Sequence, residues 1–270
     1  MGDKEREMNF KSFWGTNLLR SRVEFSRNGH HYCVYCGEKS DTREHCPSKV
    51  FLSKPYPNDL PVLPACFKCN NSFSADEMYT EIYIDALKFL SGNSNILSDK
   101  TKKHIENNTA FSDAQADWAI FRETGVMKKR EKIYRILTKL SICHMVYDLS
   151  EGYSVDGCSI KPSQIEYKTD IEMSNQEKEE FNDIIFMSDK VLPSLGSRVF
   201  DRIFVLSPVL AEIIGEETIE SPMAIMDWND VQDENYRYIA WLENDDTFHI
   251  KIVIHNFLYV EAIFPQGDLQ

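Results

Sequence analysis

Long apolar runs are missing from this sequence. No stretch approaches the roughly 20 consecutive apolar residues that a membrane-spanning helix requires. The polar start, MGDKEREMNF, has no apolar segment of the kind found in secretory signals, and internal repeats and low-complexity tracts are absent. Hydrophobic residues nevertheless make up 42% of the chain, which is enough for a packed core. These features predict a soluble, cytoplasmic protein with no membrane partner.

An excess of positive charge, which nucleic-acid-binding proteins usually carry, is also lacking, because the formal net charge is −13. The distribution is uneven. Residues 1–80 contain 11 Lys and Arg against 10 Asp and Glu, whereas residues 81–270 contain 19 against 33. The first part therefore keeps a weakly basic character. Because an acidic remainder lowers non-specific affinity for phosphate, activity on nucleic acid is expected to need a partner or activator.

The seven cysteines do not follow the pattern of a disulfide scaffold. Four of them form two Cys-x-x-Cys pairs, and each such pair offers zinc two thiolates from one backbone turn. Redox or incidental pairs are the alternative, but neither pair has the strand–helix context of a thioredoxin-like motif. We therefore predict a structural zinc ion held by Cys33, Cys36, Cys66 and Cys69.

Hydrophobic spacing and turn residues predict an α+β fold. The stretch 31–47 is expected to form a short hairpin, and the proline-containing stretch 53–64 an extended loop. Helices are expected at 10–30, from a Ser74/Glu77 capping box to about 91, at 112–121, at 128–149 with a solvated Lys-Lys-Arg start, and after a Ser174/Glu177 capping box. A small antiparallel sheet is expected at the C-terminus, from strands 200–206, 223–226, 236–242, 248–255 and 257–264, with a turn at 244–246.

The segment Arg43-Glu44-His45-Cys46-Pro47 lies between the two cysteine pairs. Over residues 31–80 the order is Cys-x-x-Cys-Gly, Glu-His-x-Pro and Cys-x-x-Cys-Asn, followed by a helix. This joint pattern resembles the HNH endonucleases, whose core is a treble-clef zinc finger or ββα-metal fold. The expected architecture is an N-terminal zinc-bound ββα-metal module, a helical middle and the small C-terminal sheet.

The resemblance also implies a set of active-site residues. His45 matches the histidine that takes a proton from the attacking water. Glu44 would bind a catalytic divalent cation and Asn70 would be its second ligand, whereas the central Asn of the motif is poorly matched, with Asn58 as the nearest candidate. Carboxylate and amide oxygens favour Mg²⁺ or Mn²⁺ over zinc. The Arg43 guanidinium would contact a flanking phosphate.

Each assignment has a structural alternative. The imidazole of His45 could pack within a zinc finger, Glu44 could be a solvated charge, Asn70 could cap a helix, and Arg43 could form a surface salt bridge. Several neighbours are ranked below them: His30 and His31 as linker residues, Cys46 as a small packed residue, His144 as a core histidine, and Asn71, Asp76 and Glu77 as auxiliary ligands.

The predicted function is a metal-dependent HNH endonuclease that hydrolyses DNA, with RNA left open because nothing in the site distinguishes ribose from deoxyribose. Residues 1–92 would form the nuclease module, and residues 93–270 would supply recognition, regulation or homodimerisation. A defence or restriction role follows only from the settings in which HNH modules often occur. The alternative is a non-catalytic, zinc-stabilised adaptor that binds nucleic acid or protein, favoured by the acidic remainder and the imperfect central Asn.

Overall fold

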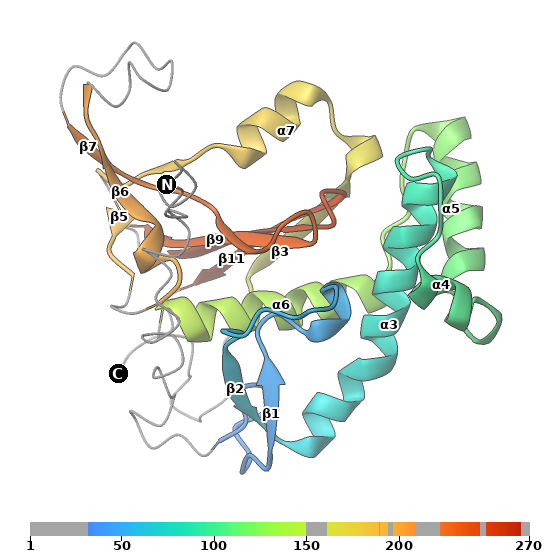
Figure 1. The fold of residues 1–270 in the computed structure, drawn as a ribbon, viewed down its shortest axis with the longest axis horizontal. Coiled ribbons are helices and arrows are strands. Elements are labelled where there is room, and N and C mark those ends of the chain that lie inside the picture. Colours follow the sequence, from blue (N-terminus) through green and yellow to red (C-terminus); the bar gives the residue numbers. More distant parts are fainter. Residues whose placement is uncertain are drawn as a thin grey trace, which may run out of the picture.

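A computed structural model of the chain describes residues 32–149, 161–188, 190–193, 197–208, 222–243 and 247–265. The helix expected at 10–30, the residues His30 and His31, and the turn expected at 244–246 lie outside the described residues. The described part is mixed α+β, as predicted, and its strand pairs are antiparallel (Figure 1).

The first part of the described chain is a two-stranded sheet followed by a long helix. Strand β1 (Thr42–His45) pairs antiparallel with β2 (Val62–Ala65), and α3 (Phe67–Leu90) begins directly after β2. Cys66 is the N-cap of α3, and its Sγ accepts a hydrogen bond from the Cys69 amide at 3.3 Å. This bond satisfies one of the amides that a helix start leaves without a partner. A cysteine of the metal motif thus also begins the helix.

Two predictions for this part were wrong. The strand that contains Glu44 pairs with Val62–Ala65 rather than with the segment around the first cysteine pair, where the chain forms only the isolated bridge between Tyr32 and Lys39. The residues between Tyr32 and Lys39 form a turn, so too few residues remain on either side to form a longer strand pair. Ser74 and Glu77 do not cap a helix, because α3 begins two turns earlier and both lie inside it.

Three further helices, α4 (Asp99–His104), α5 (Ala110–Thr124) and α6 (Glu131–Leu149), pack beside α3. The short helix α7 (Asn175–Asn182) lies instead against the six-stranded sheet described below. Helix α5 ends at Gly125, whose φ of 71° suits glycine at a helix C-terminus. The residue before α6, Arg130, is not solvated as predicted: its Nε and Nη2 contact the two oxygens of the buried Asp117 at 2.7 and 2.8 Å.

The C-terminal strands form two antiparallel sheets. The six-stranded sheet has the order β3-β11-β10-β9-β5 with β8 also on β9, and the three-stranded sheet has the order β4-β7-β6. The strands predicted at 200–206, 223–226, 236–242, 248–255 and 257–264 are confirmed within a few residues as β6, β7, β9, β10 and β11, whereas β3, β4, β5 and β8 were not predicted. The bounds are β3 Gln164–Thr169, β4 Ile185–Phe186, β5 Lys190–Val191, β6 Ile203–Leu206, β7 Met223–Met226, β8 Asn229–Gln232, β9 Tyr236–Glu243, β10 Thr247–Ile254 and β11 Leu258–Pro265.

Helix α6 is the shared element of the fold. It packs against β9, β10 and β11 and against α3, and its Lys139 reaches β1 (Figure 1). The capping box predicted at Ser174 and Glu177 is confirmed at the start of α7, which lies on the other face of the six-stranded sheet.

One cluster of buried apolar side chains extends from Val34 to Phe264 and includes residues of α3, α6 and the large sheet. The boundary at 92/93 stays a prediction. Among the described residues, no helix combines the length and the apolar character that crossing a bilayer requires.

Candidate metal centre and adjacent polar site

The four predicted zinc ligands come together. The Sγ atoms of Cys33, Cys36, Cys66 and Cys69 all lie within 4.8 Å of one another, and those of Cys36 and Cys66 are 3.7 Å apart. Tetrahedral zinc with Zn–S bonds of about 2.3 Å holds its sulfurs roughly 3.8 Å apart. The four cysteines therefore fit a zinc ion. Within the described ranges they are the one group of three or more His, Cys, Asp or Glu residues with ligand atoms this close.

Local backbone geometry builds this cluster from two separate turns. After the first pair, the Gly37 amide donates to the Cys33 carbonyl at 2.9 Å, and Gly37 has a φ of 73°, which favours glycine. The second pair occupies the first turn of α3. The amide of Val34 donates to the Pro64 carbonyl at 3.0 Å and so joins the two turns. Burial raises the pKa of Cys69 and of Cys36, so a bound cation is the natural means of holding four thiolates here.

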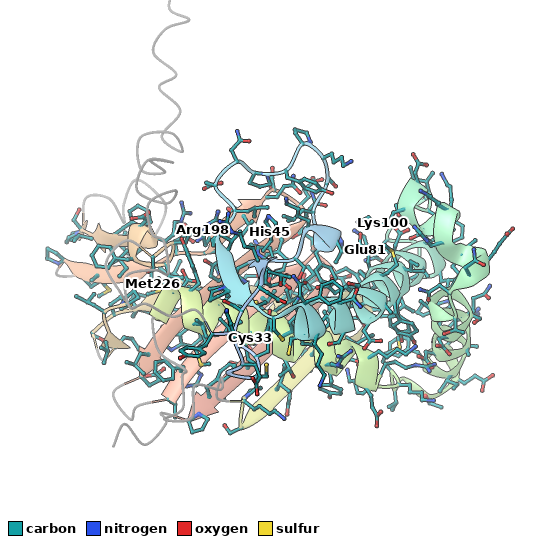
Figure 2. The ribbon with its side chains drawn as sticks, turned by 90° about the horizontal axis from the view of Figure 1, so that it is seen from below. Cys33, His45, Glu81, Lys100, Arg198 and Met226 are labelled. Carbon is teal, nitrogen blue, oxygen red and sulfur yellow. The ribbon has the colours of Figure 1, made fainter. Side chains whose placement is uncertain are left out.

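Glu44 and His45 leave β1 on opposite faces, because consecutive strand residues alternate. Glu44 is buried, with 5% of its surface exposed, whereas His45 is half-buried. In Figure 2 His45 and Cys33 are labelled at separate points, so the four-cysteine cluster and the candidate base are distinct places.

The Glu44 carboxylate lies in a buried polar cluster that the sequence did not reveal. Its Oε1 is 3.1 Å from the Lys139 Nζ of α6 and 3.4 Å from the Ser48 hydroxyl. Glu77 of α3 belongs to the same cluster, since its Oε1 accepts from Ser48 at 2.6 Å and also contacts Lys139. Burial raises the pKa of Glu44 despite the opposing effect of Lys139. In the described part of the chain, its second oxygen, Oε2, is buried without a hydrogen-bond partner.

The pairing of Lys139 has one signal in the sequence. Lys139 stands three residues after Ile136 and four before Cys143, which are both fully buried on α6. A lysine at the spacing of an apolar stripe must find carboxylates, because burying an unpaired ammonium is very unfavourable. Burial lowers the pKa of Lys139, but Glu44 and Glu77 outweigh this effect and the net pKa is raised. The spacing therefore predicts that Lys139 has buried acidic partners, but it does not identify which acids they are.

The His45 imidazole is accessible and uncommitted. No hydrogen bond from its ring to another described residue is found, and Val62, its partner on β2, is itself exposed. Burial, followed by the nearby Lys49 and Lys139 ammonium groups, lowers the pKa of His45. The ring is therefore neutral at neutral pH and able to accept a proton. Arg43, two residues earlier on the same face of β1, is exposed.

Asn70 contacts β1 without meeting Glu44. Its Nδ2 donates to the Thr42 hydroxyl and to the Arg43 carbonyl, each at 3.2 Å, and thereby fixes the start of α3 against the strand. No hydrogen bond joins Asn70 to the Glu44 carboxylate, whose partners among the described residues are Ser48 and Lys139. Asn58, the candidate central Asn, is exposed in the loop before β2.

Cys46 and His144, which were expected to be structural residues, both lie in the interior. Cys46 is buried and stands outside the four-cysteine cluster, with its Sγ 3.5 Å from His144 Nδ1. His144 is fully buried, bonds the Tyr236 hydroxyl at 2.8 Å and stacks on Tyr238 with ring centroids 3.6 Å apart. These contacts confirm His144 as a satisfied core histidine.

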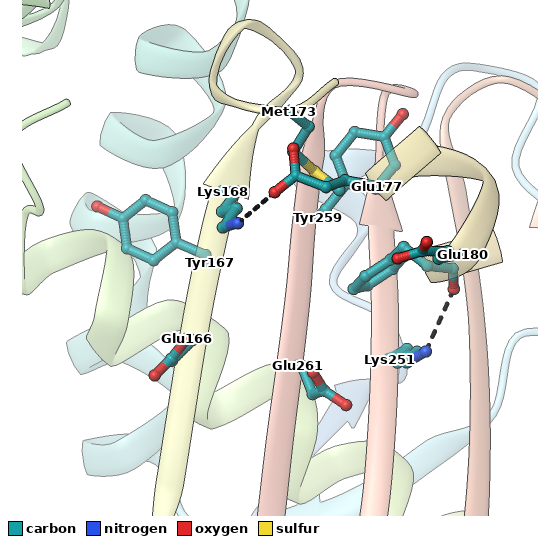
Figure 3. Close-up of a pocket in the computed structure, with 10 residues that line it drawn as sticks. Glu166, Tyr167, Lys168, Met173, Glu177, Glu180, Lys251, Tyr259 and Glu261 are labelled. Carbon is teal, nitrogen blue, oxygen red and sulfur yellow. Dashed lines mark hydrogen bonds and ion pairs between the residues drawn. The ribbon is translucent and has the colours of Figure 1, made fainter. Parts of the chain in front are cut away.

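A separate cavity of about 320 Å³ lies between α7 and the six-stranded sheet (Figure 3). Among its charged groups, Lys168 pairs with Glu177 at 2.9 Å, and Lys251 Nζ donates to the Phe181 carbonyl at 3.4 Å. None of its lining residues belongs to β1, β2 or α3. It is therefore not part of the candidate site.

No protein-family model, curated protein or solved structure matches this chain.

Proposed function

We propose that the chain is a metal-dependent HNH endonuclease that hydrolyses DNA phosphodiester bonds. One observation carries the proposal. Two zinc-type cysteine pairs clamp a strand to the start of a helix, and that strand presents an uncommitted, half-buried histidine at its end. This is the β-β-α order that the motif pattern predicts, with Glu-His on the first strand and Asn on the helix.

His45 would act as general base. Its neutral imidazole takes a proton from the water that attacks the phosphate, and its lowered pKa keeps it in the proton-accepting form. Arg43 and Lys49 supply positive charge beside it, which suits an anionic phosphodiester. Hydrogen bonds from Asn70 hold β1 against α3, so the strand that carries the base is fixed in place.

Glu44 and Asn70 are the residues that would hold the catalytic Mg²⁺ or Mn²⁺. The donor chemistry fits, because Glu44 Oε2 is a buried carboxylate oxygen without a partner and the Asn70 carbonyl oxygen makes no hydrogen bond to a described residue. Such a cation, when bound, stabilises charge on the phosphate and on the leaving oxygen. DNA is the proposed substrate and RNA is the alternative, with a protein activator and homodimerisation as further expectations and a defence or restriction role as the proposed setting.

The test is His45→Ala in the full chain. We expect plasmid cutting with Mg²⁺ or Mn²⁺ to fall by about 10²–10⁴-fold, the range that general-base catalysis contributes. Zinc content and melting temperature should be unchanged. His104→Ala, which alters a partly exposed histidine of α4, is the matched control and should cut normally. Undiminished cutting by His45→Ala refutes the assignment, and parallel assays on RNA of the same sequence separate the two substrates.

A second candidate function is a zinc-stabilised adaptor without catalysis. The ion pair between Glu44 and Lys139 favours it, because a lysine already neutralises the carboxylate that should bind the cation. The adaptor predicts binding of DNA or protein without cutting, at every Mg²⁺ and Mn²⁺ concentration and at several protein concentrations. Cutting that EDTA abolishes decides for the nuclease.

A further inference from the structure

We propose that Glu77 joins Glu44 and Ser48 in a cation site whose resident cation, when no divalent ion is bound, is the Lys139 ammonium. The inference rests on the proposed function only in using Glu44 as a ligand. It differs from the motif-based expectation in the second ligand, which is the Glu77 carboxylate in the third turn of α3 rather than the Asn70 amide in its first.

The contacts outline one small site. Lys139 Nζ donates to Ser48 Oγ at 2.7 Å, lies 3.1 Å from Glu44 Oε1 and also contacts Glu77 Oε1. Ser48 Oγ in turn donates to Glu77 Oε1 at 2.6 Å. Three oxygens from three separate segments therefore converge on a single positive charge. Oxygen ligands in this arrangement are the ones that hard divalent cations prefer.

The charges of this site do not balance. Two carboxylates face one ammonium, and Glu44 and Lys139 are almost completely buried. In the described part of the chain, Glu44 Oε2 has no hydrogen-bond partner, which is unfavourable for a buried carboxylate oxygen. Arg135, four residues before Lys139 on α6, is engaged with Asp76. A second positive charge is what the site lacks, and a divalent ion in place of the ammonium supplies it.

The different exposures of the two acids indicate a path for the ion. Glu77 is the more exposed of the two acids, with 14% of its side chain accessible against 6% for Glu44. An ion entering past Glu77 reaches Glu44, and the flexible four-carbon stem of Lys139 lets its ammonium withdraw. Asn70 lies seven residues before Glu77 on α3, about 10 Å along the axis at 1.5 Å per residue. Glu77 and Asn70 therefore do not bind the same ion directly, and Glu44 is the ligand that the contacts place beside Glu77.

The experiment measures Mn²⁺ binding by electron paramagnetic resonance on the zinc-loaded full chain without nucleic acid. Lys139→Gln keeps a hydrogen-bond donor but removes the charge, and it should bind one Mn²⁺ about tenfold or more tightly than the parent chain. Adding Glu77→Gln to this variant should abolish the gain. Lys132→Gln, an exposed lysine of the same helix, is the control and should bind like the parent.

Glu77→Gln alone is the second variant, for the case in which Lys139→Gln does not fold. It leaves a balanced Glu44–Lys139 pair, and its Mn²⁺ affinity should fall about tenfold or more below that of the parent chain. A folded Lys139→Gln protein with parental affinity, or a Glu77→Gln protein that binds as the parent does, overturns the proposal. Because no cutting is measured, failure here leaves the role of His45 standing, and failure of His45→Ala leaves this site standing.

Discussion

The β1–β2–α3 unit combines one two-stranded ladder with a four-cysteine cluster that could hold zinc and with a buried lysine partner, whereas the six-stranded sheet combines several strand ladders with packed aromatic side chains. A two-stranded sheet with one helix buries little apolar surface by itself, and such units commonly depend on a metal. The large sheet needs no such support, since more than half of the residues in each of β9, β10 and β11 are buried. The candidate site therefore lies in the part of the fold that carries the four cysteines, which could hold a zinc ion.

Two histidines show the same contrast. His144 in the interior uses both ring nitrogens and a ring face, through Cys46, Tyr236 and Tyr238. The ring of His45, on the strand next to Cys46, makes no hydrogen bond to a described residue. Burial lowers the pKa of both histidines. Only the accessible one can exchange a proton with a substrate, which is why a shifted pKa alone does not identify a base.

The largest effect is expected from removing a zinc ligand. Cys66→Ser should lose the bound zinc and unfold the β1–β2–α3 unit, because structural zinc contributes on the order of 10 kcal/mol to folding. Elemental analysis and thermal unfolding measure both outcomes. Cys46→Ala, outside the four-cysteine cluster, should keep one zinc per chain. A Cys66→Ser protein with full zinc content and an unchanged melting temperature would show that the cysteines do not form a structural site.

A smaller effect is expected from breaking the contact between helix α3 and the six-stranded sheet. Glu81 of α3 is buried and contacts Lys100 of α4 and His255, which follows β10, each at 2.8 Å. Breaking a buried pair of this kind costs about 3–5 kcal/mol, so Glu81→Gln should lower the free energy of unfolding by that amount at pH 7. Glu123→Gln, an exposed acid of α5, is the control and should change it little.

The Glu81 pair should also depend on pH. Burial raises the pKa of Glu81, but His255 and Lys100 outweigh it and the net pKa is lowered. A lowered acid pKa stabilises the folded chain fully above the unfolded-state value of about 4.3, and this contribution disappears as the pH falls through the folded-state pKa. Urea unfolding of the parent chain and of Glu81→Gln should therefore give free energies of unfolding that converge as the pH falls. A difference that grows as the pH falls would contradict the pairing.

The smallest effect is expected at the capping box of α7. Ser174→Ala removes the side chain that accepts from the Glu177 amide and should cost about 1 kcal/mol. Hydrogen bonding by the Ser174 backbone and Lys168 lowers the pKa of Glu177 to about 2. That pKa should rise in the variant, because the Ser174 hydroxyl also donates to Glu177. A carboxyl NMR titration measures the shift, and an unmoved pKa would mean that the hydroxyl contributes nothing.

The sequence by itself determined the local features. Cys-x-x-Cys spacing, the Ser174/Glu177 box and the alternating C-terminal strands are set by residues close together in the chain, and the structure confirms the closeness of the four cysteines, the cap and the strands. The helix start at Phe67 was missed for two reasons. Cys66 was interpreted only as a metal ligand although it is also the N-cap, and Ser74-x-x-Glu77 has the more familiar pattern of a capping box. Arg130 was misjudged because its partner, Asp117, is on another helix.

Only the tertiary structure decided what surrounds the candidate site. Lys139 is 95 residues from Glu44 in sequence, and the two meet because α6 packs between the large sheet and the β1–β2–α3 unit. Whether a carboxylate binds a metal or a lysine depends on which charge the packing brings within a few ångströms, and pairings between distant segments leave no periodic trace in the sequence. The residue types indicated that Glu44 could be an oxygen ligand, and the fold showed that the Lys139 ammonium already lies beside its carboxylate.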